Sequence, residues 1–415
     1  MPTPEQVFAR IATQPGAVWL DGGGEGWSVL AWAPDEVVTS AVGWPDTGRR
    51  LSRGVTEVDS DAPFAGGCLG FLGFGAGCQV APVPRCRRAA EPHVWLGRFA
   101  GGLCFRHSDR TWHPAGTAVF VDAALALLAS AEPLGEPATA TGDAAGTMDR
   151  EVYRAGVGRI LAWIGEGDCY QVNLTRVVHL TGVGDPWQAY RRLRAIGPAP
   201  YGAFIRIGPD QAILSNSPEL FLEVDQAMLR SRPIKGTRPR GESAAEDLML
   251  LEALSSSPKD RAELTMIVDL VRNDLGRVAR TGSVHTSPRQ ITGLSNVHQA
   301  WQEVSARLET GLDAWHAVAA SFPPGSVTGA PKSRACLRIS ELEEEARGVY
   351  CGAIGFVDIR GRSVWNVAIR TAVFDGDRAR YHVGGAIVAA SDPEEEWQET
   401  IAKGSLLYAA LAQSN

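Results

Sequence analysis

Residues 213–241, ILSNSPELFLEVDQAMLRSRPIKGTRPRG, combine two strand patterns with the most unusual loop of the chain. Apolar residues recur from Ile213 to Val224 and from Met228 to Arg232, which predicts a β-hairpin that turns at Asp225-Gln226. Lys235 follows the second strand, between a proline that fixes the chain direction and a glycine that lets a ligand approach. We therefore expect Lys235 on a rigid, exposed loop.

Two residues of this stretch carry ambiguous signals. Glu219 lies on the first predicted strand, and a single glutamate on a strand is usually solvated. The charge around Lys235 favours a neutral, nucleophilic amine, because neighbouring cations lower the pKa of a lysine. A basic, solvated surface loop is the alternative explanation of the same segment. The neighbouring cations are Arg230, Arg232, Arg238 and Arg240.

The overall composition is that of a globular protein, with 45% hydrophobic and 21% charged residues among 415. This length allows two or three domains, or one large α/β domain. The net charge of -7 gives no indication of nucleic acid or an anionic membrane as a partner. No apolar run is long enough to cross a bilayer and the first residues lack a secretion signal, so we expect a cytoplasmic protein.

The cysteines are scattered and odd in number, without a CxxC pair. This pattern predicts reduced thiols and argues against a disulfide framework or a structural zinc site. The seven residues are Cys68, Cys78, Cys86, Cys104, Cys169, Cys336 and Cys351.

The first 147 residues are rich in short strand patterns. The glycines of 64–77 predict a strand and turn packed closely against another backbone, and a phosphate loop is excluded because no Lys-Ser/Thr pair follows. We expect antiparallel strands in 18–58, 95–105 and 117–121, a short helix at 123–131 and a linker at 132–147.

The second part contains longer helices and a strand meander. Helical periodicity predicts helices from 149 to 165, after the Ser257-Pro258 cap and after Ser391-Asp-Pro393. The loop that begins at Phe322 leads into a further helix, where Lys332 and backbone amides could hold an anion. Residues 350–391 predict a three-stranded meander.

Several charged residues of these elements are candidates for chemistry. Glu263 lies on the apolar face of its predicted helix, where a carboxylate needs a partner or a metal. Glu396 and Glu399, at i and i+3, can serve one hard cation, although a solvated acidic helix start is the better explanation of these two residues taken alone. Arg370 lies in an apolar strand, where a cation is costly unless it meets a carboxylate.

Seven motifs of the chain occur in the order found in the family of chorismate-utilising enzymes, which the chain resembles. They are SPELF, PIKGT, KDRAELTMIVDLVRNDLGRV, FPPGSVTGAPKSRA, YCGAIGF, AIRTAV and SDPEEEWQETIAK, and they lie between about residues 150 and 410. The resemblance implies an α/β fold of the α+β type, a large two-layer antiparallel β-sandwich with helices outside. It divides the chain into an N-terminal lobe of the sandwich, 1–147, and a chorismate-binding catalytic region, 148–415.

Lys235 separates the members of this family. Anthranilate synthases carry a small residue in the Pro-Ile-x-Gly-Thr motif, whereas aminodeoxychorismate synthases carry lysine. The resemblance therefore implies amination of chorismate at ring carbon 4, in the pathway to p-aminobenzoate and folate. Lys235 would attack carbon 2 as the 4-hydroxyl leaves, Glu219 would protonate that hydroxyl, and ammonia would then displace the lysine.

The same motifs imply the remaining site residues. Glu263 and Glu399 would be Mg²⁺ ligands, with Glu396 beside them. The residues implied to bind substrate are Gly236, Thr237, Thr328, Tyr350, Arg370, Gly384, Gly385 and Lys403.

Three segments depart from the family pattern. Gln299 stands where the family often has a histidine and His298 is one place early, so His298 is not assigned a catalytic role. The Gly-Ala-Gly carboxylate loop reads Gly384-Gly-Ala386. Leu20-Asp-Gly22 lacks the serine of tryptophan-sensitive members, so we expect no tight inhibition by tryptophan.

The resemblance also implies a partner and leaves rival functions. No G-x-C-x-G nucleophile elbow is present, so we expect ammonia from a separate glutamine amidotransferase subunit. Anthranilate synthase component I is the first rival, and Lys235 opposes it. An isochorismate or salicylate synthase would need a lysine in the strand that here holds Gln171, Asn173 and Thr175. A non-catalytic partner subunit is the alternative from another class.

Overall fold

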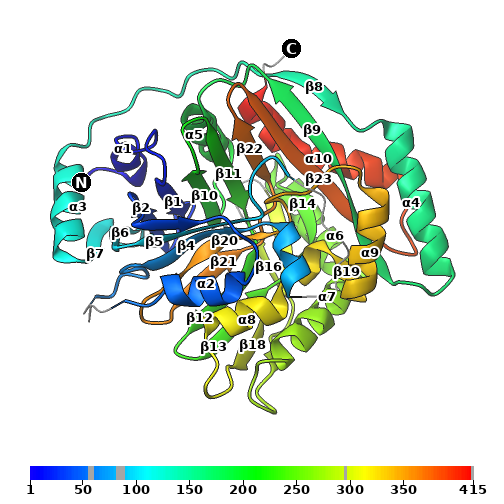
Figure 1. Cartoon of the computed structure of the whole chain (residues 1–415). Helices are drawn as coiled ribbons and strands as arrows, with labels where there is room; N and C mark the ends of the chain where they lie inside the picture. The colour runs from blue at the N-terminus through cyan, green and yellow to red at the C-terminus, as the bar shows by residue number, and fades with distance from the viewer. Residues whose placement is uncertain (55–59, 81–88, 294–296, 413–415) are drawn as a thin grey trace.

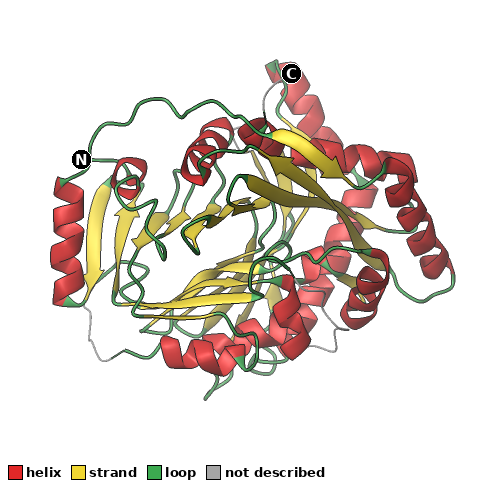
Figure 2. Cartoon of the chain, turned by 45° about the horizontal axis from the view of Figure 1, so that its top comes forward, coloured by secondary structure: helices red, strands yellow, loops and turns green. Residues whose placement is uncertain are grey.

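The centre of the protein consists of two large antiparallel sheets, with helices around the outside of the strands (Figure 1, Figure 2). The structure is a computed structural model that describes residues 1–54, 60–80, 89–293 and 297–412. The two large antiparallel sheets with helices outside confirm the expected α+β sandwich. Among the described helices, none is long and apolar enough to span a membrane.

The first sheet contains eleven described strands and brings distant parts of the chain side by side. In spatial order they are β19 (Gly329–Ala330), β9 (Gln171–Thr181), β23 (Arg378–Ile387), β22 (Thr371–Asp375), β11 (Gln211–Ser217), β10 (Tyr201–Arg206), β1 (Val18–Asp21), β2 (Trp27–Ala31), β6 (Gly101–Arg106) and β7 (Thr111–Gly116), while β8 (Asp143–Thr147) pairs with β9.

The second sheet contains nine described strands, and a third, smaller sheet contains three. The order in the second is β15 (His285–Thr286), β18 (Val304–Arg307), β13 (Met228–Arg232), β12 (Leu220–Asp225), β21 (Ser363–Asn366), β20 (Ala353–Asp358), β4 (Gly67–Leu72), β5 (Val94–Phe99) and β3 (Glu36–Val38), and in the third it is β14 (Ile234–Pro239), β17 (Val297–Trp301) and β16 (Gln290–Gly293).

The helices cover the sheets and begin at recognisable caps. Asp149, Ser257 and Asp392 cap the helices predicted at 149, 257 and 391, which confirms these three starts. The α-helices are α1 (Pro4–Phe8), α2 (Trp44–Leu51), α3 (Ala118–Ala129), α4 (Arg150–Gly165), α5 (Pro186–Ile196), α6 (Ala244–Ser256), α7 (Pro258–Gly276), α8 (Ala314–Ser321), α9 (Lys332–Leu342) and α10 (Pro393–Leu411), and the short 3₁₀ helices are η1 (Phe74–Gln79) and η2 (Gly325–Val327).

Apolar side chains fill the space between the two sheets and the space under the helices. Ile205 and Ile213 of the first sheet belong to one buried cluster with Phe71 and Phe356 of the second. Trp187 of α5 and Leu407 of α10 are in a cluster on the first sheet. Burial of apolar surface on both faces of each sheet is the main stabilising contribution that these positions allow.

The N-terminal part is built into both sheets. β1 pairs with β10, and β4 pairs with β20, so strands from 1–147 lie beside strands from the rest of the chain. A Cβ on Gly70 of β4 would lie 1.9 Å from the carbonyl oxygen of Trp95, which confirms the close backbone packing predicted for 64–77. The division into 1–147 and 148–415 stays a prediction.

Several predicted elements were wrong in type or extent. Residues 213–224 are not one strand, because the chain crosses from β11 in one sheet to β12 in the other at Pro218-Glu219. Part of 18–58 forms α2, and 117–121 begins α3, not a strand. Residues 350–391 contain four strands divided between two sheets. The hairpin β12–β13 was predicted correctly.

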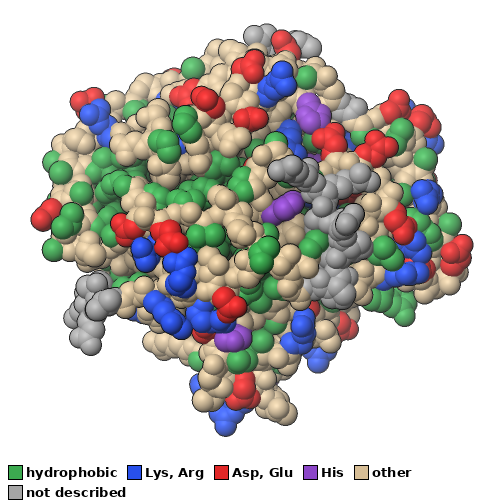
Figure 3. All heavy atoms as spheres, viewed as in Figure 1, with side chains coloured by type: hydrophobic (Ala, Val, Ile, Leu, Met, Phe, Trp, Pro, Cys, Tyr) green, Lys and Arg blue, Asp and Glu red, His purple; other side chains and the backbone are tan. Residues whose placement is uncertain are grey.

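The cysteines and the surface charge also bear on the predictions. Cys78 is disulfide-bonded, so the prediction of reduced thiols is wrong for this residue, and Cys86 lies outside the described residues. On the face shown in Figure 3, basic and acidic side chains are interspersed. The buried free thiols are Cys68, Cys104, Cys169, Cys336 and Cys351.

Candidate active site

Glu219 lies at the point where the chain crosses between the two sheets. Its backbone is fixed on both sides: the amide of Glu219 donates to the Ser217 hydroxyl at 3.2 Å, and the amide of Val367 donates to the Glu219 carbonyl at 3.0 Å. Only 4% of the Glu219 residue is exposed. The solvated position that is usual for a single glutamate on a strand is therefore excluded, and Glu219 is a buried acid held by rigid neighbours.

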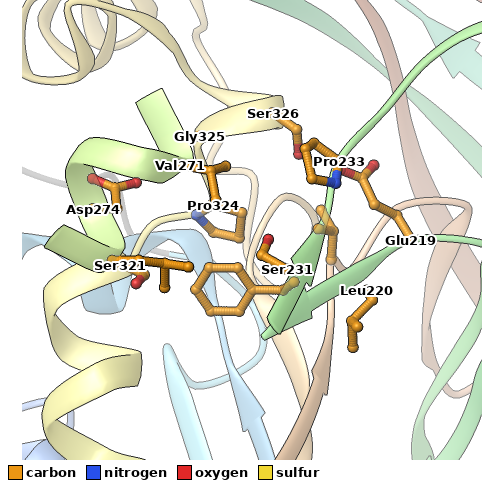
Figure 4. Close-up of a pocket in the computed structure, with 13 residues that line it drawn as sticks. Glu219, Leu220, Ser231, Pro233, Val271, Asp274, Ser321, Pro324, Gly325 and Ser326 are labelled. Carbon is orange, nitrogen blue, oxygen red and sulfur yellow. The ribbon is translucent and has the colours of Figure 1, made fainter. Parts of the chain in front are cut away.

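Burial controls the protonation of Glu219. Loss of water raises the pKa of its carboxyl group to about 7, although hydrogen bonds from the Ser326 hydroxyl and the Ile234 amide and the nearby charge of Lys235 act in the opposite direction. A carboxyl group with such a pKa can donate a proton near neutral pH. Figure 4 shows Glu219 and Ser326 beside the cavity that they line.

Lys235 lies on strand β14 and is half-buried, so the predicted exposed loop is wrong. Burial lowers the pKa of Lys235, and the positive charge of Lys403 lowers it further, against the opposing charges of Glu263 and Glu219. Gly236, which follows, has a φ of +88°, and the pairing of β14 with β17 shifts its register between Ile234 and Thr237. A glycine is needed for this bulge.

The arginines around Lys235 do not explain its low pKa, contrary to the prediction. Each is paired with a carboxylate that offsets its charge. Desolvation by the surrounding protein is the main cause instead. The pairs are Arg230–Glu223, Arg232–Glu303, Arg238–Asp260 and Arg240–Asp247.

Three glutamates of α7 and α10 interact electrostatically, and two of them, Glu263 and Glu399, also act on Lys235. Burial raises the pKa of Glu263 and of Glu396, and the charge of Glu399 raises both further. Burial also acts to raise the pKa of Glu399, but Lys403, whose Nζ lies 2.5 Å from Glu399 Oε1, lowers it overall. The structure therefore brings the three predicted carboxylates into one electrostatic cluster.

The cluster fits a metal ion only in part. Among the described residues, no group of three or more Asp, Glu, His or Cys side chains is arranged as a metal site. The Oε1 atom of Glu396 accepts from the Ser391 hydroxyl at 2.6 Å, but its buried Oε2 atom has no hydrogen-bond partner. A hard cation such as Mg²⁺ takes one or two protein carboxylates and completes its shell with water and substrate oxygens, so this donor set suits it.

Arg370, just before β22, provides a positive charge that has no ion-pair partner among the described residues. Burial is the cause that lowers the pKa of its guanidinium, and among the described residues the side chain has no ion pair or hydrogen bond. The residue also has a φ of +51°, a strained conformation for arginine. A half-buried, unpaired guanidinium is the group that binds a ligand carboxylate in a bidentate manner.

Gly384 and Gly385 of β23 leave room for neighbouring groups. A Cβ on Gly384 would lie 2.2 Å from the Leu174 carbonyl oxygen, and a Cβ on Gly385 would lie 2.7 Å from Glu396 Oε2. The Lys403 amine donates to the Gly384 carbonyl at 3.1 Å. These contacts place the glycine pair beside the carboxylate cluster.

The remaining predicted substrate ligands have mixed positions. Thr237 is exposed on β14, whereas Thr328 is fully buried and its hydroxyl donates to the carbonyls of Pro324 and Gly325. Tyr350 is buried and stacks on His382, with ring centroids 5.5 Å apart. The hydroxyl of Thr328 is thus occupied within the protein.

The segment with the displaced histidine forms strand β17. His298 is buried and its Nε2 atom lies 2.9 Å from Asp247 Oδ1 on α6, so its contact is with a helix of the protein. Gln299 points to the opposite face of the strand, since side chains alternate along β17.

On β9, both side-chain amide atoms of buried Gln171 lack a hydrogen-bond partner among the described residues.

Sequence reasoning missed Ser326 and misassigned Lys332. Lys332 does not present a free cation to an anion, because its Nζ lies 2.6 Å from Asp274 Oδ2. The proximity of Ser326 to Glu219 had no local signal, because 107 positions separate them in the sequence. Ser326 and Glu219 each lie in a motif of the sequence, but only the fold shows that they are in contact.

A second cavity of about 480 Å³ lies between the two sheets. Leu20, Asp21 and Gly22, the segment that lacks the serine, contribute to its wall together with Arg230 and Arg232. The prediction on tryptophan inhibition concerns this cavity and stays a prediction.

Comparison with known proteins assigns the chain to a protein family. The profile of the chorismate binding enzyme family matches residues 16–409. The chain belongs to the family of chorismate binding enzymes.

Two curated relatives and one solved structure are similar to most of the chain. Aminodeoxychorismate synthase of Streptomyces griseus is 44% identical over 84% of this chain, which spans 50% of that relative's length. Aminodeoxychorismate synthase component 1 of Salmonella typhimurium is 38% identical over 84% of this chain and 77% of its own. Anthranilate synthase component I from Streptococcus pneumoniae superposes with a TM-score of 0.80 at 28% identity, over 92% of each chain.

Proposed function

We propose that this chain is the component I type of aminodeoxychorismate synthase and converts chorismate and ammonia to 4-amino-4-deoxychorismate, the precursor of p-aminobenzoate. The observation that carries the proposal is the juxtaposition of Lys235, whose pKa is lowered by burial, with Glu219, whose pKa is raised to about 7 by burial. The two shifts act in complementary directions, toward the neutral form of the Lys235 amine and the protonated form of the Glu219 carboxyl group.

The two residues divide the chemistry of the first displacement. The Lys235 amine forms a bond to ring carbon 2, both conjugated double bonds of the ring shift, and the carbon 4–oxygen bond breaks. Glu219 gives its proton to the departing hydroxyl, which leaves as water. The pKa directions of both groups favour the protonation states that this step needs.

The second displacement restores the lysine. Ammonia forms a bond to carbon 4, the two ring double bonds shift back to their original positions, and the bond between carbon 2 and the Lys235 nitrogen breaks. This releases a neutral amine. The product then carries an ammonium group at carbon 4, and the Glu219 carboxylate takes one of its protons. The net reaction is chorismate plus ammonia to aminodeoxychorismate plus water.

Substrate binding would use the charges around this pair. Arg370 would hold a carboxylate of chorismate, and the backbone around Gly384 and Gly385, with Tyr350 and Lys403, would complete the site. Gly236 and Thr237 on the lysine strand and Thr328 on the facing loop would border the ring.

The same proposal includes a magnesium ion. Glu263 and Glu399 would hold it, with Glu396 in direct or water-mediated contact. When bound, Mg²⁺ neutralises negative charge on a substrate carboxylate. The protein's own contribution is the carboxylate cluster: burial raises the pKa of Glu263 and of Glu396, the charge of Glu399 raises both further, and a cation would relieve the repulsion from Glu399.

We include a separate glutamine amidotransferase subunit as the source of ammonia and a cytoplasmic location in this proposal. The name component 1 of the Salmonella relative supports a second subunit. The test is to incubate the purified chain with chorismate, Mg²⁺ and an ammonium salt and to identify the product by mass spectrometry. Aminodeoxychorismate is expected, whereas anthranilate would show that the lysine motif does not decide the reaction.

A further inference from the structure

A small cavity beside Glu219 is lined by residues of α7 and of the loop before α9, and several polar groups lie on its otherwise apolar wall (Figure 4). Its polar lining consists of Glu219, Ser231, Asp274, Ser321 and Ser326. The space available to the centre of a water molecule is about 10 Å³, close to the volume needed for one buried water.

One group of the lining has an unmet hydrogen-bonding need. Ser321 is buried, and among the described residues its hydroxyl has no partner. A buried hydroxyl without a partner is rare, because its desolvation is costly. A cavity of one-water size with a free hydroxyl and two carboxyl groups on its wall is a site that binds a water molecule.

One carboxylate of the cavity wall, that of Asp274, belongs to an ion pair. Lys332 Nζ lies 2.6 Å from Asp274 Oδ2, and the two side chains are only 13% and 8% exposed. The same amine donates to the Ser321 carbonyl at 2.8 Å. Because Lys332 contacts both α7 and Ser321, it ties the two ends of the segment 321–332 to one helix.

The segment tied in this way carries the hydroxyl that reaches Glu219. Ser326 donates its hydrogen bond to the Glu219 carboxyl group. Gly325, just before it, lies against α7, since a Cβ there would be 2.8 Å from Leu270 and 3.8 Å from Asp274 Oδ2. Movement of the ion pair would therefore move Ser326 relative to Glu219.

We propose that the cavity binds one water molecule and that the Asp274–Lys332 ion pair, through this water and Ser326, positions the carboxyl group of Glu219 for proton transfer. Asp274 and Lys332 are positioning residues in this account, since neither borders the lysine or the substrate. The inference rests on the proposed function, in which Glu219 is the acid.

The test is the pH profile of chorismate consumption. The charged groups that face Glu219 are Lys235 of β14 and Lys403 of α10, and the test variants keep both. Ser326→Ala removes a hydrogen bond that lowers the pKa of Glu219, so the alkaline limb of the profile should move to higher pH. Asp274→Asn should move the same limb in the same direction, with a fall in kcat and little change in KM for chorismate.

Coupling between the two residues gives the sharper readout. The double variant Ser326→Ala/Asp274→Asn should lose no more activity than the more impaired single variant, since both act on one group. Asp269→Asn is the matched control on α7, where the exposed carboxylate pairs with Arg272, and it should leave kcat and the limb unchanged. An Asp274→Asn chain with a lower melting temperature but a wild-type limb and kcat would overturn the inference.

Two further variants serve if Asp274→Asn does not fold. Lys332→Arg keeps the charge but changes its geometry, and Ser321→Ala removes the unpartnered hydroxyl from the cavity. A shifted limb in these folded variants supports the inference, and a wild-type limb in both overturns it. Product identity tests the proposed function separately, because the rate of chorismate consumption is measured whatever product forms.

Discussion

Gly385 of β23 and Glu396 of α10 approach so closely that a Cβ on Gly385 would lie 2.7 Å from Glu396 Oε2, and the carboxylate would have to move. The glycine therefore allows the buried carboxylate to lie against the strand. In this chain the carboxylate loop of the family pattern is Gly384-Gly-Ala386. The requirement for a glycine at 385 follows from its contact with Glu396.

Gly385→Ala should displace Glu396 and lower kcat/KM by about 100-fold, because a shift of about 1 Å in a site has that order of effect. The measurement is the rate of chorismate consumption as a function of Mg²⁺ concentration, and the variant should need more Mg²⁺. Gly158→Ala is the control, since a Cβ there would meet no atom within 4 Å and the position is helical. Equal effects of the two substitutions would contradict this account.

Arg370→Lys should raise the KM for chorismate by about 10- to 100-fold, because a point charge does not replace a planar, bidentate guanidinium. The unpaired state of Arg370 in the described structure means that no internal ion pair is lost. Arg378→Lys, at an exposed position on the same pair of strands, is the control and should leave KM unchanged. Equal KM values for wild type and Arg370→Lys would argue against a carboxylate at Arg370.

His298→Ala should lower the free energy of unfolding by about 1–2 kcal/mol, because the buried ring loses its bond to Asp247. The kcat for chorismate should stay within about twofold of wild type, since the histidine faces α6. Urea unfolding and steady-state kinetics on the same preparation give both values. A loss of kcat with unchanged stability would restore His298 as a catalytic candidate.

Glu219 should make the protein less stable as the pH rises. Its pKa in the folded chain is about 7 against an ordinary value of 4.5, so between these values the native state holds a proton that the unfolded chain releases. The stabilisation is complete below the unfolded pKa and is lost as the pH passes about 7, with a size on the order of 3 kcal/mol. In Glu219→Gln this dependence should be absent, which urea unfolding at a series of pH values measures.

The helices of the site could be predicted from the sequence, because their signals are local. Ser257 and Asp392 mark the starts of α7 and α10. The periodicity of apolar residues placed Glu263 on the apolar face of α7. These elements carry the carboxylate cluster. Helix caps and helical periodicity need only neighbouring residues, so tertiary context did not alter them.

The position and environment of Lys235 and Glu219 could not be predicted in the same way. An apolar run looks the same whether it stays in one sheet or crosses to another, so the crossing at Pro218-Glu219 gave no signal. The arginines near Lys235 suggested the correct direction of its pKa for the wrong reason, since carboxylates pair with them and one of these partners, Glu303, lies 71 positions from Arg232 in the sequence. Burial, which dominates both pKa values, depends on the whole fold.

The most direct test of the central claim is to incubate wild type and Lys235→Ala with chorismate, Mg²⁺ and an ammonium salt, and to identify the products by mass spectrometry. Lys235→Met serves as the matched control for side-chain volume, and thermal unfolding shows that each variant is folded. We predict aminodeoxychorismate from the wild type and a fall on the order of 1,000-fold or more in both variants, because the nucleophile is lost. Without ammonia, intact mass of the wild type should show a lysine-linked substrate adduct that neither variant forms. Aminodeoxychorismate produced by Lys235→Ala at the wild-type rate would contradict covalent catalysis by Lys235.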